Sequence, residues 1–77
     1  MNYFELFEMP VSLQIDKKAL SAKYFELQKK YHPDFFSQSD EEEQLESLQI
    51  SSDINKGFKI FQQLDLTIKY VLQLKGL

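Results

Sequence analysis

Apolar side chains recur every three or four positions along most of this chain, which is the spacing of one face of an α-helix. The clearest stripe consists of Leu20, Tyr24, Leu27 and Tyr31. Asp16 precedes this stripe at the position where a carboxylate accepts the first free amides of a helix. The pattern therefore predicts a helix that begins after Asp16 and ends at about Tyr31, with the stripe facing the core.

A second stripe follows farther along the chain and consists of Leu45, Leu48, Ile54, Phe58 and Phe61. Ser39 and Glu42 have the spacing of a capping box, and the acidic run at residues 40–43 suits the positive end of a helix dipole. We expect a long helix from about residue 40, with Leu48, Ile54 and Phe58 buried. Capping explains the acidic run locally, so no partner is assigned to it.

Two shorter helices complete the pattern. Asn2 and Glu5 have capping-box spacing and predict a helix at residues 3–7, while Asp65 is a suitable N-cap for a helix at residues 66–74. Gly76 stands where a helix commonly ends in a left-handed residue. The inward positions of the last helix are expected to be Ile68, Val71 and Leu72.

The chain contains only two Gly and two Pro, which favours long helices over a sheet with many turns. We predict one all-α domain at residues 1–77, built as an antiparallel hairpin of the second and third helices. A loop at residues 32–38 joins these two helices, and the short helices lie at either end of the chain. Seven Phe and four Tyr predict an aromatic-rich core.

Composition narrows the classes of function. Without Cys and with a single His, the chain lacks disulfides, thiolate sites and the usual zinc ligand sets, so neither a metal nor a cofactor is expected. No set of catalytic groups is evident, and we expect no enzyme activity. The net charge of −3 gives no global attraction for nucleic acid or an anionic membrane. No signal-like segment is evident, which predicts a cytoplasmic protein, or a mitochondrial matrix protein if a targeting segment has been removed.

The predicted second helix is locally basic, with five Lys and one Glu between residues 17 and 30. Helical geometry places Lys18, Phe25 and Lys29 close together opposite the core stripe, with Lys23 and Lys30 on one flank. Such a face is either simply solvated or a surface for a partner. If it binds a partner, a protein with an acidic surface fits better than nucleic acid, because no nucleic-acid motif accompanies the lysines.

His32, Pro33 and Asp34 follow this helix directly. Pro33 disfavours a helical conformation at His32, and Asp34 can bond neighbouring backbone amides, so the three residues form a stiff corner. From these residues alone, the corner is either a turn that ends a helix or a site that presents two polar side chains.

The surrounding sequence resembles the J domain of DnaJ-type co-chaperones. The resemblance rests on Lys-Lys-Tyr-His-Pro-Asp at residues 29–34 and Ile-Asn-Lys-Gly-Phe at residues 54–58. More narrowly, the chain resembles the N-terminal domain of the HscB/Jac-type co-chaperone of iron–sulfur cluster assembly. The stretches that carry this narrower resemblance are Asn-Tyr-Phe-Glu-Leu-Phe at 2–7, Gln-Ile-Asp at 14–16, Leu-Gln at 27–28 and Tyr-Val-Leu-Gln-Leu-Lys-Gly at 70–76.

This resemblance implies a monomeric domain that binds a DnaK/HscA-type seventy-kilodalton heat-shock chaperone and stimulates its ATP hydrolysis. The chaperone-binding residues carried over are His32, Pro33, Asp34, Lys23, Lys29 and Lys30, and geometry adds Phe25. In the family, an iron–sulfur scaffold protein binds through a C-terminal domain that is absent here. A general J-domain co-chaperone for protein folding and a passive helical interaction module remain alternatives.

Three positions depart from the family pattern. Glu26 and Phe35 stand where general J domains often carry a basic residue, which weakens the local positive field. Thr67 stands where close relatives carry an Arg, so no role of that Arg is transferred to it.

Overall fold

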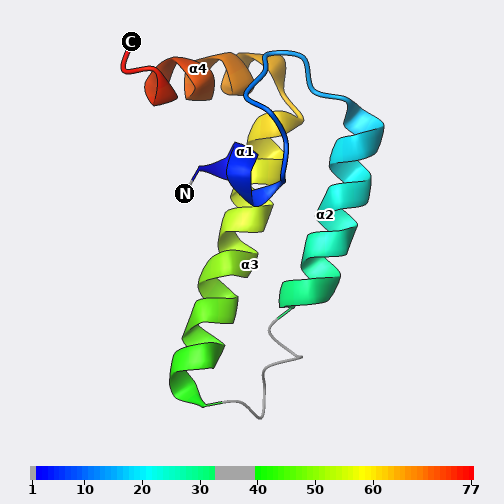
Figure 1. Ribbon diagram of the computed structural model, residues 1–77, viewed down its shortest axis with the longest axis vertical. Coiled ribbons are helices and arrows are strands. Elements are labelled where there is room, and N and C mark those ends of the chain that lie inside the picture. Colours follow the sequence, from blue (N-terminus) through cyan, green and yellow to red (C-terminus); the bar gives the residue numbers. More distant parts are fainter. Residues whose placement is uncertain (1, 33–39) are drawn as a thin grey trace.

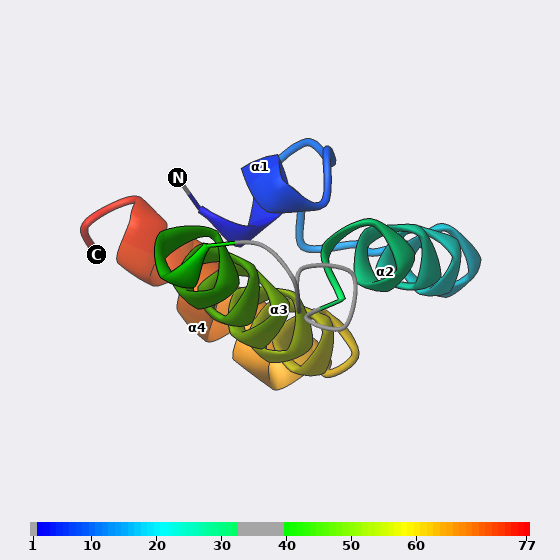
Figure 2. The same ribbon diagram turned by 90° about the horizontal axis from the view of Figure 1, so that it is seen from below.

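The structure is a computed structural model that describes residues 2–32 and 40–77, and within these ranges it is all-helical (Figure 1). Its helices are α1 (Tyr3–Leu6), α2 (Lys17–Tyr31), α3 (Glu41–Phe61) and α4 (Leu64–Leu74). The α2 and α3 helices run antiparallel, α1 lies against α3, and α4 crosses one end of the hairpin (Figures 1 and 2). Each of the other helices packs on α3, which is therefore the centre of the fold. The predicted all-α hairpin architecture is confirmed.

The first two helices begin where local capping predicts. The Asn2 Oδ1 atom accepts a hydrogen bond from the Glu5 amide at 2.8 Å. The Asp16 Oδ1 atom accepts from the amides of Lys18 and Ala19 at 2.9 and 3.3 Å. These bonds satisfy amides that have no partner within a first helical turn.

The other two helix starts differ from the prediction by one or two residues. The N-cap of α3 is Asp40, whose Oδ1 atom accepts from the Glu43 amide at 2.8 Å, so the prediction of Ser39 as the cap was wrong. The N-cap of α4 is Gln63 and not Asp65. Asp65 instead lies in the first turn, where its negative charge suits the helix dipole.

Two helices end in the same way, with a residue in the left-handed region. At the end of α4 this residue is Gly76, with φ of 74°, and the Leu77 amide donates to the Leu72 carbonyl at 2.9 Å. The predicted role of Gly76 is thereby confirmed. At the end of α1 the same role falls to Glu8, with φ of 54°, a conformation that is unusual for a residue with a side chain.

The core is aromatic and lies where α1, α3 and α4 meet. The rings of Phe4, Phe7 and Phe61 are almost entirely buried. The Phe61 ring centroid lies 4.7 Å from that of Phe4 and 5.6 Å from that of Phe7, which it meets edge to face. Between α2 and α3 the predicted burial of Leu20, Leu27 and Ile54 is confirmed.

The predicted stripe of α3 was partly wrong. Leu45 is 61% exposed and Leu48 is 53% exposed, so neither side chain belongs to the core. The buried residues of this helix are Ser47, Ile54, Gly57 and Phe61. Two of these four are small, and small residues let neighbouring elements approach closely while carrying little apolar signal in the sequence. Phe58 and Tyr31 are half-buried, and neither is the fully buried core residue that the pattern predicted.

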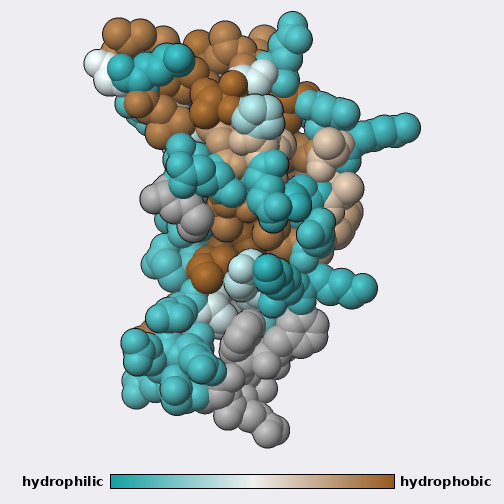
Figure 3. Space-filling model, in the orientation of Figure 1, coloured by the Kyte–Doolittle hydropathy of each residue, from teal (hydrophilic) through white to brown (hydrophobic). Residues whose placement is uncertain are grey.

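The inward face of α4 is also shifted from the prediction. Val71 is buried as expected, but Ile68 and Leu72 are exposed. Hydrophobic residues gather on the surface over α4, at the top of the view in Figure 3. Thr67 is buried instead, and its hydroxyl donates to the carbonyls of Ile60 and Gln63, both at 2.9 Å. Because these bonds satisfy the hydroxyl, a polar side chain is tolerated at this core position.

Candidate functional site

The described part of the predicted corner is His32, which follows the C-terminal end of α2, the end farther from α4 (Figure 1). His32 is the C-cap of α2; it is exposed and has an extended backbone, with φ of −61° and ψ of 132°. This conformation is the one that a following proline favours. Pro33 and Asp34 lie outside the described residues, so the structure places only the first residue of the corner.

Lysines of α2 have different roles, although the sequence suggested a single basic face. The Lys17 ammonium turns away from that face and donates to the carbonyls of Phe61 and Gln62, at 2.9 and 2.6 Å. Carbonyls at the C-terminus of a helix carry partial negative charge, so Lys17 caps α3. Because Lys17 lies beside the end of α3, its charge stabilises the fold.

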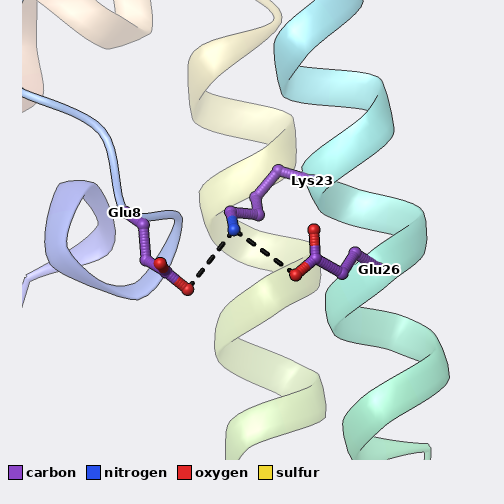
Figure 4. A network of polar contacts seen from close by, with 3 residues as sticks. All are labelled: Glu8, Lys23 and Glu26. Atoms are coloured by element: carbon purple, nitrogen blue, oxygen red, sulfur yellow. Dashed lines mark ion pairs between the residues drawn. The ribbon is translucent and has the colours of Figure 1, made fainter.

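Lys23 is also engaged within the domain (Figure 4). Its Nζ atom lies 3.3 Å from the Glu8 Oε1 atom and 3.5 Å from the Glu26 Oε1 atom, and its side chain is only 20% exposed. Burial lowers the pKa of Lys23, but the hydrogen bond to Glu8 and the charges of Glu26 and Glu8 outweigh burial and raise it above its ordinary value. Lys23 therefore links α2 to the residue that ends α1.

Three other cationic or aromatic candidates remain on the surface of α2. Lys29, Lys30 and Phe25 are exposed, as is Lys18, which helical spacing places on the face of Phe25 and Lys29. The Lys30 ammonium lies 5.2 Å from the centre of the Tyr31 ring, within the range of a cation–π contact. In the described part of the chain, neither Lys18 nor Lys29 forms an ion pair.

A polar bridge between α2 and α3 escaped the sequence reasoning. The Asn55 Oδ1 atom accepts hydrogen bonds from the Tyr24 hydroxyl and the Gln28 amide group, both at 2.9 Å. The Tyr24 ring also stacks on Phe58, with centroids 4.0 Å apart and planes at 13°. The sequence signal for this bridge was that Tyr24 and Gln28 are four residues apart and therefore share a helix face. Their common acceptor could not be identified, because Asn55 is 27 or more residues away in the chain.

The surface holds grooves where the end of α2 lies near α3. One groove of about 270 Å³ is lined by Tyr31, Glu43, Glu46, Ser47 and Ile50. Within residues 2–32 and 40–77, no cluster of three His, Cys, Asp or Glu side chains is suited to hold a metal ion. No helix in the described part of the chain is both long and apolar enough to span a membrane.

The class of protein follows from this geometry. An antiparallel hairpin with His32 at its turn, a short helix against its side and a fourth helix across its far end is the arrangement expected of a J domain. No protein-family model matches the chain.

Individual proteins match closely. The chain is 44% identical over all 77 residues to the co-chaperone protein HscB homolog of Psychromonas ingrahamii, of which it covers 46%. It is 45% identical over 75 residues to the HscB homolog of Acinetobacter baylyi, of which it covers 41%. The structure of chaperone HscB from Vibrio cholerae aligns with the whole chain at a TM-score of 0.95 and 35% identity, and 47% of that protein is covered.

The chain thus has the fold of the matched part of HscB and is similar to it in sequence, which is consistent with the J domain of HscB and confirms the resemblance seen in the sequence. It spans about half the length of the relatives that it matches.

Proposed function

We propose that this domain is a co-chaperone module that binds an HscA-type member of the seventy-kilodalton heat-shock chaperones and stimulates its ATP hydrolysis in iron–sulfur cluster assembly. The proposal is carried by His32, which is exposed at the end of α2. All 77 residues of the chain align with an HscB homolog. The relatives are named co-chaperones.

The module acts without chemistry of its own. Its residues bind and position the chaperone, which hydrolyses the ATP, and the domain itself is no enzyme and works as a monomer in the cytoplasm. His32 supplies a donor and an acceptor, Asp34 supplies a charge for strong hydrogen bonds, and Pro33 limits the entropy lost on docking. Binding of an iron–sulfur scaffold protein is assigned to the part of the relatives that this chain does not match.

Substitution of His32 tests the proposal. Gln also forms hydrogen bonds and Pro33 still ends the helix, so His32→Gln should preserve the circular-dichroism spectrum and the melting temperature. We expect the same variant to abolish the stimulation of single-turnover ATP hydrolysis by a purified HscA-type chaperone. Asp34→Asn should behave in the same way, because it keeps the shape of the side chain and removes its charge.

The assay also separates the alternatives. A general folding co-chaperone would stimulate a DnaK-type chaperone at least as well as an HscA-type chaperone. Full stimulation by the His32→Gln variant, with a chaperone that the wild-type domain activates, would leave only a passive helical interaction module.

A further inference from the structure

Phe25 is a large aromatic side chain that the fold leaves in solvent. It lies in the middle of α2 and is 70% exposed. Its one ring contact within the described residues is with Tyr24, whose centroid lies 5.7 Å away at an interplanar angle of 63°. The ring does not fill the core and caps no helix, so the described residues give no structural reason for an aromatic residue at this position.

The support beneath Phe25 is rigid. Tyr24, the neighbour of Phe25, is held against α3 by two interactions: its ring stacks on Phe58, and its hydroxyl donates to Asn55. Phe25 itself has only two side-chain torsions and sits on a helix whose opposite face is packed. An aromatic presented in this way loses little conformational entropy on binding, which is the property of interface anchors.

The exposed charges around Phe25 are mostly positive, and the exposed carboxylate next to it, Glu26, is paired with Lys23. Lys18 and Lys29 are seven residues before and four residues after it, so all three lie on one face of α2. Lys17 and Lys23 are turned inward to α3 and Glu8, and Glu26 on the flank is paired with Lys23. The face of α2 that carries Phe25 thus presents an apolar ring between the ammonium groups of Lys18 and Lys29. It contains fewer lysines than the basic face that the sequence suggested.

We propose that Phe25 inserts into an apolar pocket bordered by carboxylates on the chaperone that this domain activates. The inference rests on the proposed function and adds the chemistry of the partner surface. Lys18 and Lys29 accelerate the approach to the carboxylates, and the buried ring holds the complex together. Nucleic acid is disfavoured as the occupant by the net charge of −3.

The experiment measures binding of the wild-type domain and its variants to the ATP-bound HscA-type chaperone by biolayer interferometry. Phe25→Ala should raise the Kd about 30-fold, mostly through faster dissociation, as for an interface hot spot. Its free energy of unfolding should stay near that of wild type, since the ring is exposed. Leu45→Ala is the matched control, because Leu45 is a similarly exposed apolar residue on α3, and the Kd of this variant should not change.

The two lysines should act differently from the ring. The double variant Lys18→Gln with Lys29→Gln should slow association several-fold and flatten its salt dependence, because exposed charges act over about 8–10 Å in salt. In the ATPase assay, Phe25→Ala should raise the domain concentration needed for half-maximal stimulation and leave the plateau unchanged. His32→Gln should instead lower the plateau.

Each outcome has a defined meaning. An unchanged Kd for Phe25→Ala, with a chaperone that wild type binds, overturns the pocket and leaves the proposed function intact. An equal loss for Leu45→Ala also overturns it, because the effect would then not be specific to this face. Absence of wild-type binding overturns both the pocket and the proposed function.

Discussion

At the scale of single residues, Gly57 sets how closely α1 can approach α3. A Cβ atom built on Gly57 would lie 3.0 Å from the Phe7 Cε1 atom and 3.3 Å from the Cβ and Cγ atoms of Tyr3. Phe7 is fully buried, so its ring has little room to move away. The position therefore needs a residue without a side chain because of packing, not because of its backbone angles.

This contact predicts the effect of Gly57→Ala. Ala gains about 1 kcal/mol in helix propensity, but crowding of a packed core costs about 1–3 kcal/mol. We expect a net loss of about 1 kcal/mol in the free energy of unfolding, measured by urea denaturation. Lys56→Ala, at the exposed neighbouring position, is the control and should lose much less; a more stable Gly57→Ala variant would contradict the close approach.

At the scale of elements, the two ends of α3 are stabilised from different sources. Its N-terminus is capped locally by Asp40 and carries Glu41, Glu42 and Glu43 in the first turn. Its C-terminus receives the Lys17 ammonium from the start of α2, which is 44 residues away from Phe61 in the chain. The interaction of Lys17 satisfies these carbonyls and also holds the start of α2 beside the end of α3.

Removal of this ammonium should therefore weaken the fold. Lys17→Met keeps most of the apolar stem and removes the charge, and we expect a loss of about 1 kcal/mol in the free energy of unfolding, the typical value for a net hydrogen bond. Lys18→Met is the matched control because its neighbouring ammonium forms no ion pair within the described residues. Equal stability of the two variants would show that the Lys17 cap contributes nothing.

At the scale of the whole molecule, the ion pair between Lys23 and Glu8 ties α1 to α2. The two helices share no extensive direct packing of their own, since each packs chiefly on α3. Glu8 reaches Lys23 from the left-handed turn that ends α1. The pair thus fixes a short helix of four residues beside the long hairpin.

The raised pKa of Lys23 predicts how this link depends on pH. A group whose pKa is higher in the folded state stabilises the fold below its ordinary pKa, about 10.5, and loses that contribution as the pH rises through the folded-state value. Wild type should therefore exceed Glu8→Gln in stability at pH 7, and the difference should shrink by pH 11. Denaturation at both pH values measures this, with Glu5→Gln as the control; a difference that grows with pH would refute the pairing.

Much of the fold was predictable from the sequence because its signals are local. Asn2, Asp16 and Gly76 act within a few residues of themselves, so the helix ends that they set could be read without knowing the neighbours. The periodicity of α2 identified Leu20 and Leu27 correctly for the same reason. Of the candidate site, the placement of His32 directly after α2 was predictable, because the proline that follows it disfavours a helical conformation at His32.

Tertiary structure alone decided which face of each helix is buried and where each lysine points. Leu45 and Leu48 have the spacing of core residues, yet Ser47 and Gly57 are buried in α3, and at Gly57 the reason is the close approach of Tyr3 and Phe7. Lys17 and Lys23 looked like members of one basic face, but a long flexible side chain goes to the nearest opposite charge. Lys23 has one local partner in Glu26, but the carbonyls that Lys17 caps and the Glu8 carboxylate lie on segments distant in the chain, which no local pattern can reveal.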